Sequence, residues 1–189
     1  MILEETVNIL NRKYQIALIL LTLAFTQQVF AGNSLEMTAE IENSGECDIS
    51  ISPSSIEFKR RPIVSDFIAN DAVDTQLLSL TYECKGYDSN VKPEIKVTGS
   101  VSNDANLFLS ASSQGASGAG FMLKNGKITN LTGFYTTGNT LTDGDTLFLP
   151  AGENQGELPL TIGFMRQSGN QTITAGSVKA SILLTVLMP

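Results

Sequence analysis

The last strand-like segment of this chain runs to its very end. An apolar residue occupies every second position there: Val178, Ala180, Ile182, Leu184, Val186 and Met188. This period of two predicts a β-strand with one apolar face. A similar segment near the other end places Leu35, Met37, Ala39 and Ile41 on one face. A strand at a sheet edge leaves backbone groups unpaired, so two such ends favour a chain that pairs with other chains.

The first 31 residues have the organisation of a secretory signal peptide. Arg12 and Lys13 precede an apolar run from Ile16 to Phe25, and Val29-Phe30-Ala31 is a small-x-small cleavage pattern. The run has about 10 residues, whereas a membrane span needs roughly 20, so a retained membrane helix is the weaker alternative. Cleavage after Ala31 would leave 158 of the 189 residues, which predicts one domain. The true start codon stays open, because Glu4 and Glu5 are unusual so early in a signal peptide.

Charge and cysteine content narrow the class of protein further. The formal net charge of −7 argues against nucleic acid and anionic lipid as partners. The only cysteines, Cys47 and Cys84, both follow the signal peptide. An oxidising compartment would join them in a disulfide, and two buried free thiols are the alternative.

Residues 32 to 189 show short alternating segments between Gly, Ser, Asn and Asp clusters, which is typical of an all-β fold. The number and spacing of the segments predict a sandwich of two antiparallel sheets. Pro159, which has no amide donor, should lie at a sheet edge or strand start. The expected strands are Leu35 to Ile41, Cys47 to Ile51, Leu77 to Cys84, Glu94 to Thr98, Leu107 to Ala111, Gly120 to Lys124, Leu131 to Phe134, Thr146 to Leu149, Glu157 to Phe164 and Ser177 to Met188.

Turn residues separate these segments. Asn125-Gly126 fits a two-residue hairpin, and Asp143-Gly144-Asp145 and Ser168-Gly169-Asn170 fit tight turns. The Gly/Ser/Ala-rich stretch from Ser112 to Gly120 predicts a surface loop, and a domain boundary is the alternative.

The residues that catalysis usually needs are missing from the sequence. It contains no histidine, no G-x-S-x-G elbow and no phosphate-binding glycine motif, so no catalytic site, cofactor or metal is expected. Asp143 and Asp145 could contact calcium, but a plain turn is favoured because the remaining ligands are absent. The basic run Lys59-Arg60-Arg61 before Pro62 predicts an exposed loop, with contact to an acidic partner or a glycan as the alternative.

Taken together, these motifs resemble those of bacterial chaperone–usher fimbrial subunits, related to the pilins of type 1 and P pili. The chain has a signal peptide, then an alternating segment, then Cys47 and Cys84. This order and the spacing of the two cysteines are similar to those of that family. Two further segments resemble it: Ser117-Gly118-Ala119-Gly120-Phe121-Met122-Leu123 in mid-chain, and Thr174-Ala175-Gly176 before the final strand. One departure is Met188, where many members carry Tyr.

The resemblance implies an incomplete immunoglobulin-like β-sandwich that a donor strand from another subunit completes. It divides the chain into a signal peptide (1–31), a donor segment (32–41) and a pilin domain (42–189). Leu35, Met37, Ala39 and Ile41 would enter a neighbour's groove, and the strand from Val178 to Met188 would border the groove and pair with a periplasmic chaperone. Ala39 would stand where a small residue is usual.

The resemblance further implies a structural subunit that is exported through the periplasm to a cell-surface fimbrium. Its partners would be the chaperone, an outer-membrane usher and other pilin subunits, with no nucleic acid; a host receptor is unidentified. Two alternatives stay open. One is a single-domain adhesive pilin or a minor tip or adaptor pilin, because the donor segment is short, as in minor and adaptor pilins. The other is a free-standing secreted Ig-like binding module. An enzymatic function is the least favoured interpretation.

Overall fold

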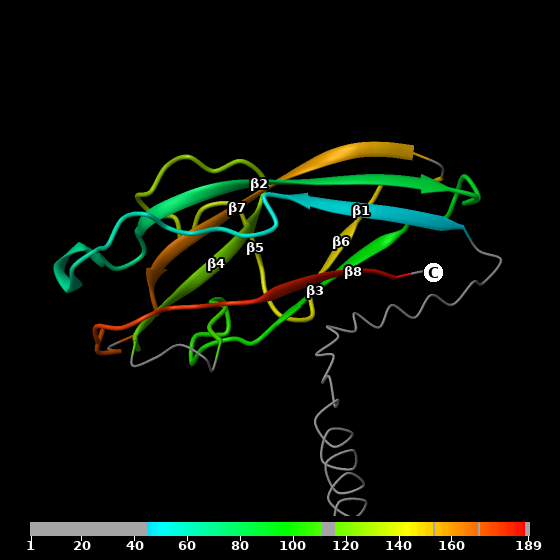
Figure 1. The fold of residues 1–189 in the computed structure, drawn as a ribbon. Helices are drawn as coiled ribbons and strands as arrows, with labels where there is room; N and C mark the ends of the chain where they lie inside the picture. The colour runs from blue at the N-terminus through cyan, green and yellow to red at the C-terminus, as the bar shows by residue number, and fades with distance from the viewer. Residues whose placement is uncertain (1–44, 111–115, 153, 170, 188–189) are drawn as a thin grey trace, which may run out of the picture. The chain divides into compact units, whose positions relative to one another are not determined.

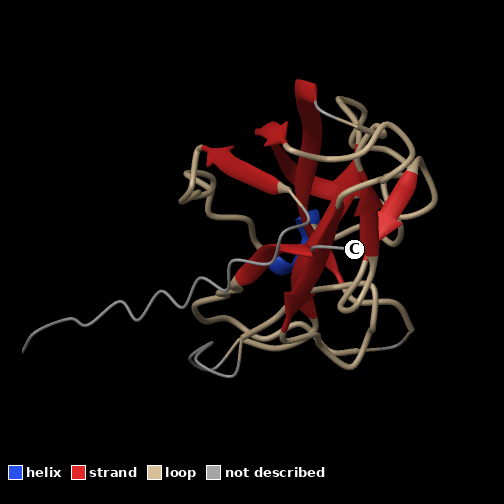
Figure 2. Ribbon diagram, turned by 90° about the vertical axis from the view of Figure 1, so that its right-hand side faces the viewer, coloured by secondary structure: helices blue, strands red, loops and turns tan. Residues whose placement is uncertain are grey.

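The computed structural model describes residues 45–110, 116–152, 154–169 and 171–187. They belong to one compact unit, Glu42–Pro189. Figure 2 shows that its regular structure is almost entirely strand, with one short 3-10 turn. The elements are β1 (Glu46–Ser52), the turn η1 (Val64–Asp66), β2 (Ala72–Lys85), β3 (Glu94–Gly99), β4 (Ala119–Asn125), β5 (Asn139–Leu141), β6 (Thr146–Phe148), β7 (Asn154–Arg166) and β8 (Ile182–Leu187).

The strands form two sheets whose pairings are all antiparallel. The large sheet has the order β1-β2-β7-β4-β5, and the small sheet has the order β6-β3-β8. In Figure 1 the long strands β1, β2 and β7 lie above β3 and β8. The predicted all-β sandwich is therefore confirmed.

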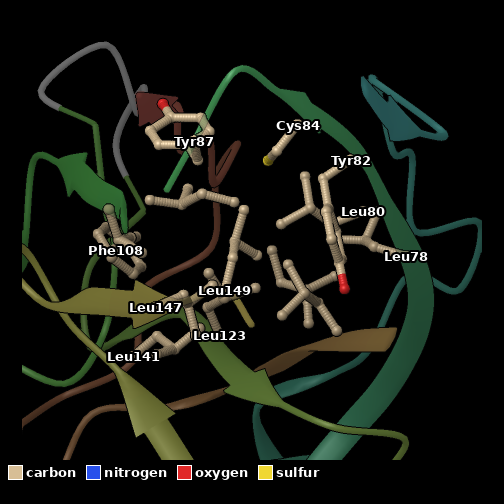
Figure 3. Packing of buried hydrophobic residues seen from close by; sticks show 14 residues of the cluster. Leu78, Leu80, Tyr82, Cys84, Tyr87, Phe108, Leu123, Leu141, Leu147 and Leu149 are labelled. Atoms are coloured by element: carbon tan, nitrogen blue, oxygen red, sulfur yellow. The ribbon is translucent and has the colours of Figure 1, made fainter. Parts of the chain in front are cut away.

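Alternating side chains of both sheets build the core between them. On β2, Leu78, Leu80 and Tyr82 are buried while the residues between them are more exposed. Ile95 and Val97 of β3 face them from the small sheet and are fully buried. Figure 3 shows the β2 side chains pointing toward a second group, Leu123, Leu141, Leu147 and Leu149. This burial supplies the main favourable free energy of the fold.

The predictions of two strands are wrong. Residues 107–110 form no strand, and Phe108 makes only isolated bridges to Val101 and Phe121. Residues 131–134 lie in a loop and turn. Leu107, Phe108 and Phe134 are fully buried and anchor these loops to the core, whereas Leu131 is exposed. A burial signal over four or five residues does not distinguish such an anchor from a short strand.

The Asn125-Gly126 turn does not close a two-residue hairpin. Gly126 has a positive φ of 107°, as a turn requires, but Asn125 pairs with Asn139 and the chain makes a long excursion between them. The excursion carries Phe134 into the core beneath Gly163, where a side chain on residue 163 would collide with the ring. By contrast, Asp143-Gly144-Asp145 forms the expected tight turn, between β5 and β6.

Pro159 lies in β7, which is an interior strand of the large sheet, yet its position explains the missing amide. It pairs with Ser79 of β2 on one side. On the other side, pairing with β4 begins only at Leu160. The Pro159 carbonyl accepts a hydrogen bond from the Gly126 amide on that side (2.8 Å), where the chain leaves β4. The expectation of a sheet edge or a strand start is therefore wrong: the proline lies inside an interior strand, and its missing amide is tolerated because the β4 ladder ends beside it.

Candidate functional site: a groove between β1 and β8

Each of the two sheets ends in a strand that lacks a neighbour on one side. β1 pairs with β2, and β8 pairs with β3. Among the residues that the structure describes, no strand pairs with the outer edge of either β1 or β8. Figure 1 shows β1 at the edge of the large sheet and β8 beside it in the small sheet. Between these two edges the sandwich is open.

The burial of side chains shows how this opening exposes the core. The inward residues of β1 are Cys47, Ile49 and Ile51, and all three are only half-buried. The inward residues of β8 alternate in the same way and are also half-buried: Ile182, Leu184 and Val186. The strands next to them, β2 and β3, bury their inward side chains almost completely. Apolar surface therefore remains in contact with water along the line between β1 and β8.

Near the start of β8 the opening forms a cavity of about 510 Å³. Apolar side chains from both sheets and from the loop after β1 line it: Ile51, Ile56, Phe58, Leu78, Phe121, Ile162, Val178, Ala180 and Ile182. Pro53, Ser54, Ser55, Lys179 and Ser181 complete the rim. A concave surface of this size with an apolar floor can accept several side chains of a binding partner.

Aromatic rings form the floor of this cavity. The Phe58 and Phe121 rings stack with centroids 5.5 Å apart, and Phe164 stacks on Phe121 at 5.1 Å. Phe67 meets the Phe164 ring edge-on at 5.3 Å. Such ring pairs add to area burial and give the floor a defined shape. The floor of the cavity is therefore held by packing between the large sheet and the loop after β1.

The structure places part of the expected groove strand at this site. Val178, Ala180, Ile182, Leu184 and Val186 all occupy half-buried positions, as the alternation predicts. The regular strand begins later than expected, at Ile182 rather than at Ser177. Met188 and the four donor residues Leu35, Met37, Ala39 and Ile41 lie outside the described residues, so their roles stay predictions.

Cys47 and Cys84 form a disulfide within the described unit. The two residues are directly opposite each other in the β1–β2 pairing. The bridge fastens β1, the edge strand of the large sheet, to the strand that carries much of the core. It therefore holds one wall of the groove in place.

Several groove residues were not identified from the sequence. Phe58 and Ile56 lie in the loop after β1, and Phe121 belongs to a strand whose orientation the sequence did not indicate. The available signal was the alternation of Ile56 and Phe58, which resumes after Pro53 one residue out of phase with that of Ile49 and Ile51. It shows that the chain keeps its inward face after the regular strand has ended.

The remaining candidate sites have structural roles in the described unit. Asp143 accepts a hydrogen bond from the Gly99 amide (2.9 Å), and Asp145 accepts one from the Thr142 amide (2.7 Å). The two carboxylates therefore hold a turn, as expected. Across the described residues we find neither a group of three metal-ligating side chains nor a helix of membrane-spanning length.

Comparisons with known proteins extend this description. Neither a protein-family model nor a curated protein sequence matches the chain. Among solved structures, a chaperone–usher pilus subunit aligns over 82% of this chain and 94% of its own length, with a TM-score of 0.51 and 14% identity. This chain has the fold of a chaperone–usher pilus subunit.

Two further structures of this pilin class align with lower scores. The P pilus rod subunit PapA covers 82% of this chain and 99% of its own length, with a TM-score of 0.47 and 18% identity. The CupB6 tip adhesin from Pseudomonas aeruginosa covers 61% of this chain, with a TM-score of 0.44 and 19% identity. This chain spans about 30% of the length of that adhesin.

Proposed function

We propose that this chain is a structural subunit of a chaperone–usher fimbria and polymerises by donor-strand exchange. The observation that carries the proposal is the groove itself: two strand edges and two half-buried apolar faces border one cavity. A strand inserted there would pair with the backbone of β8 and bury the exposed core. Backbone hydrogen bonds would provide affinity, and alternate side chains would fix the register.

The segment from Asn33 to Ile41 is the proposed donor strand. Leu35, Met37, Ala39 and Ile41 give it one apolar face, as the groove requires. Because every pairing in the sandwich is antiparallel, we infer that the segment enters antiparallel to β8. Ile41, at its end, would then lie near the start of β8, beside the cavity.

Before polymerisation the groove needs a temporary occupant. An exposed apolar groove with unpaired strand edges promotes aggregation. A periplasmic chaperone that lends a strand would cover it, and an outer-membrane usher would be the place where the next subunit replaces that strand. The route would begin with removal of the signal peptide after Ala31 and end in the cell-surface fimbrium. Replacement by a better-fitting strand makes the polymer kinetically stable.

Deletion of residues 33–41 tests the donor assignment. The truncated subunit should still bind its chaperone, because the groove is intact, but it should not insert into a neighbour. Co-purification with the chaperone and the appearance of SDS-resistant oligomers measure the two properties separately. A truncated subunit that joins fibres at the wild-type level would rule out this segment as the donor.

A further inference from the structure

The loop between β1 and β2 holds three large aliphatic side chains in solvent. Ile63, Val64 and Ile68 are 67%, 56% and 61% exposed. They lie in and beside η1, at the left end of Figure 1. Burial of such side chains in an interface would be favourable, because it removes apolar surface from water. We call these three residues the apolar tip.

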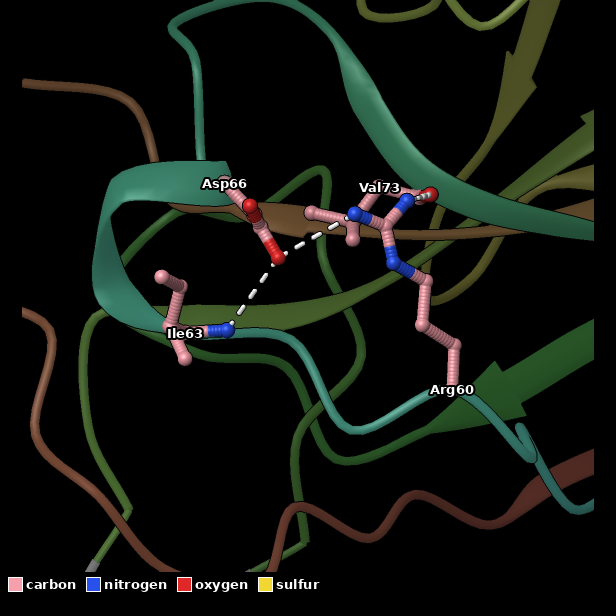
Figure 4. A network of polar contacts seen from close by, with 4 residues as sticks. All are labelled: Arg60, Ile63, Asp66 and Val73. Carbon is pink, nitrogen blue, oxygen red and sulfur yellow. Dashed lines mark hydrogen bonds and ion pairs between the residues drawn. The ribbon is translucent and has the colours of Figure 1, made fainter.

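The tip is held in a defined conformation. Arg60 Nη2 donates to Asp66 Oδ2 (3.1 Å), and the same carboxylate oxygen accepts from the Ile63 amide (3.2 Å) (Figure 4). Arg60 Nη1 also reaches the Val73 carbonyl (3.4 Å). Phe67, between the exposed residues, is buried. A surface that is already ordered loses less conformational entropy when a partner binds.

Exposed cations adjoin the apolar tip. Lys59 and Arg61 are both exposed, and within the described part of the chain neither makes an ion pair. They belong to the longest basic run in a chain whose net charge is −7. A partner for the tip should therefore present carboxylates to these cations.

Carboxylates gather at the opposite end of the domain. Asp48 and Glu83 are direct cross-strand neighbours, and Glu46 precedes them at the start of β1. Lys85, opposite Glu46, is paired with Glu83 (2.7 Å). Like charges directly opposite in a sheet are unfavourable; because Lys85 already pairs with Glu83, an added cation would act mainly on Asp48. β2, which runs from the tip to these carboxylates, is roughly 45 Å long at about 3.3 Å per residue.

The length of the chain before β1 brings these two ends together in a polymer. This step rests on the proposed function. The donor segment ends at Ile41 and β1 begins at Glu46, so extended chain separates them by at most about 18 Å. In the antiparallel orientation, Ile41 lies near Val178 of the recipient. Val178 packs on the same aromatic cluster as Phe67, at the base of the apolar tip.

We propose that the apolar tip of one subunit docks on the start of β1 and the end of β2 in a second copy of this chain. Lys59 and Arg61 then face the carboxylates of Asp48 and Glu83. The contact would add to donor-strand exchange and would fix the angle between successive subunits. Because it joins opposite ends of the domain, it is a head-to-tail contact that extends along a fibre.

The test uses fibres of the full mature chain. The triple variant Ile63→Ser/Val64→Ser/Ile68→Ser should form the same SDS-resistant ladder as the wild type, since its groove and donor segment are unchanged. Its fibres should dissociate in guanidinium about tenfold faster, the usual kinetic effect of a lost contact. They should also show a wider spread of angles between subunits in electron micrographs. Leu77→Ser, which removes another exposed aliphatic from the outer face of β2, is the matched control and should behave like the wild type.

A charge exchange provides a second arm. Arg61→Glu should accelerate dissociation, and the double variant Arg61→Glu/Asp48→Lys should restore the wild-type rate. Triple-variant fibres that have the wild-type dissociation rate and the wild-type spread of angles between subunits would overturn the docking inference. They would leave donor-strand exchange intact. The absence of a ladder in the wild type would instead overturn the proposed function and this inference with it.

Discussion

Lys124 is a fully buried cation in β4. Its Nζ donates to the Tyr135 carbonyl (2.9 Å) and to Thr140 Oγ1 (2.7 Å), and it lies 5.6 Å from the centre of the Phe134 ring. Burial lowers the pKa of the amine below its ordinary value of 10.5. The folded state therefore binds this proton less tightly than the unfolded state does.

The sign of the pH dependence follows from this difference. The stabilising effect of the lowered pKa is complete above pH 10.5 and is lost as the pH falls through the lower, folded-state pKa. The free energy of unfolding of the mature chain should therefore rise as the pH approaches 10.5, and Lys124→Met should abolish the rise. Chemical denaturation across alkaline pH measures it, with Lys127→Met, an exposed lysine, as the control. Parallel profiles for wild type and Lys124→Met would contradict this account.

The disulfide between Cys47 and Cys84 should stabilise the fold. Cys47→Ser opens a loop of 37 residues in sequence separation, which by chain entropy costs roughly 4 kcal/mol of stability. Because the bridge also fastens β1, periplasmic yield and the denaturation midpoint should both fall. Ser50→Ala, an exposed change on the same strand, should leave both unchanged. Wild-type values for Cys47→Ser would show that the bridge has no structural role.

At the scale of elements, the apolar face of the proposed donor strand would fit the apolar cavity near β8. Ile41→Ser should slow fibre assembly, because a polar side chain would enter the apolar cavity lined by Phe58 and Phe121. Glu40→Ser should have little effect, since residue 40 would face away from the groove in the proposed donor strand. The rate at which SDS-resistant oligomers appear from chaperone complexes measures both. Equal slowing by both variants would contradict the proposed register.

Sequence reasoning identified most strands, including short ones, and failed where apolar residues are few or anchor loops. The expected segments correspond to β1, β2, β3, β4, β6, β7 and β8, with bounds that differ by up to five residues. β5 was missed because only Leu141 of its three residues is apolar. The expected strands at Leu107 and Phe134 were wrong because loops also bury apolar anchors. The floor of the groove was missed for a related reason: Phe58 and Phe121 come together only through tertiary packing.

At the scale of the whole molecule, the sandwich has a core along β2, β3 and β7 and an opening between its outer strands β1 and β8. The central claim is that this fold becomes complete only when another chain inserts a strand. An incomplete core should make the isolated subunit unstable and the polymer resistant to dissociation. The proposed head-to-tail contact would then act on a fibre already joined by strand exchange.

The most direct test is to express the mature chain in a periplasm with and without a cognate pilus chaperone, then to compare yield and size by gel filtration. The account predicts a soluble one-to-one complex with the chaperone, and aggregates or SDS-resistant ladders without it. A stable, folded monomer obtained without the chaperone would contradict it, because the groove would then need no strand from another protein.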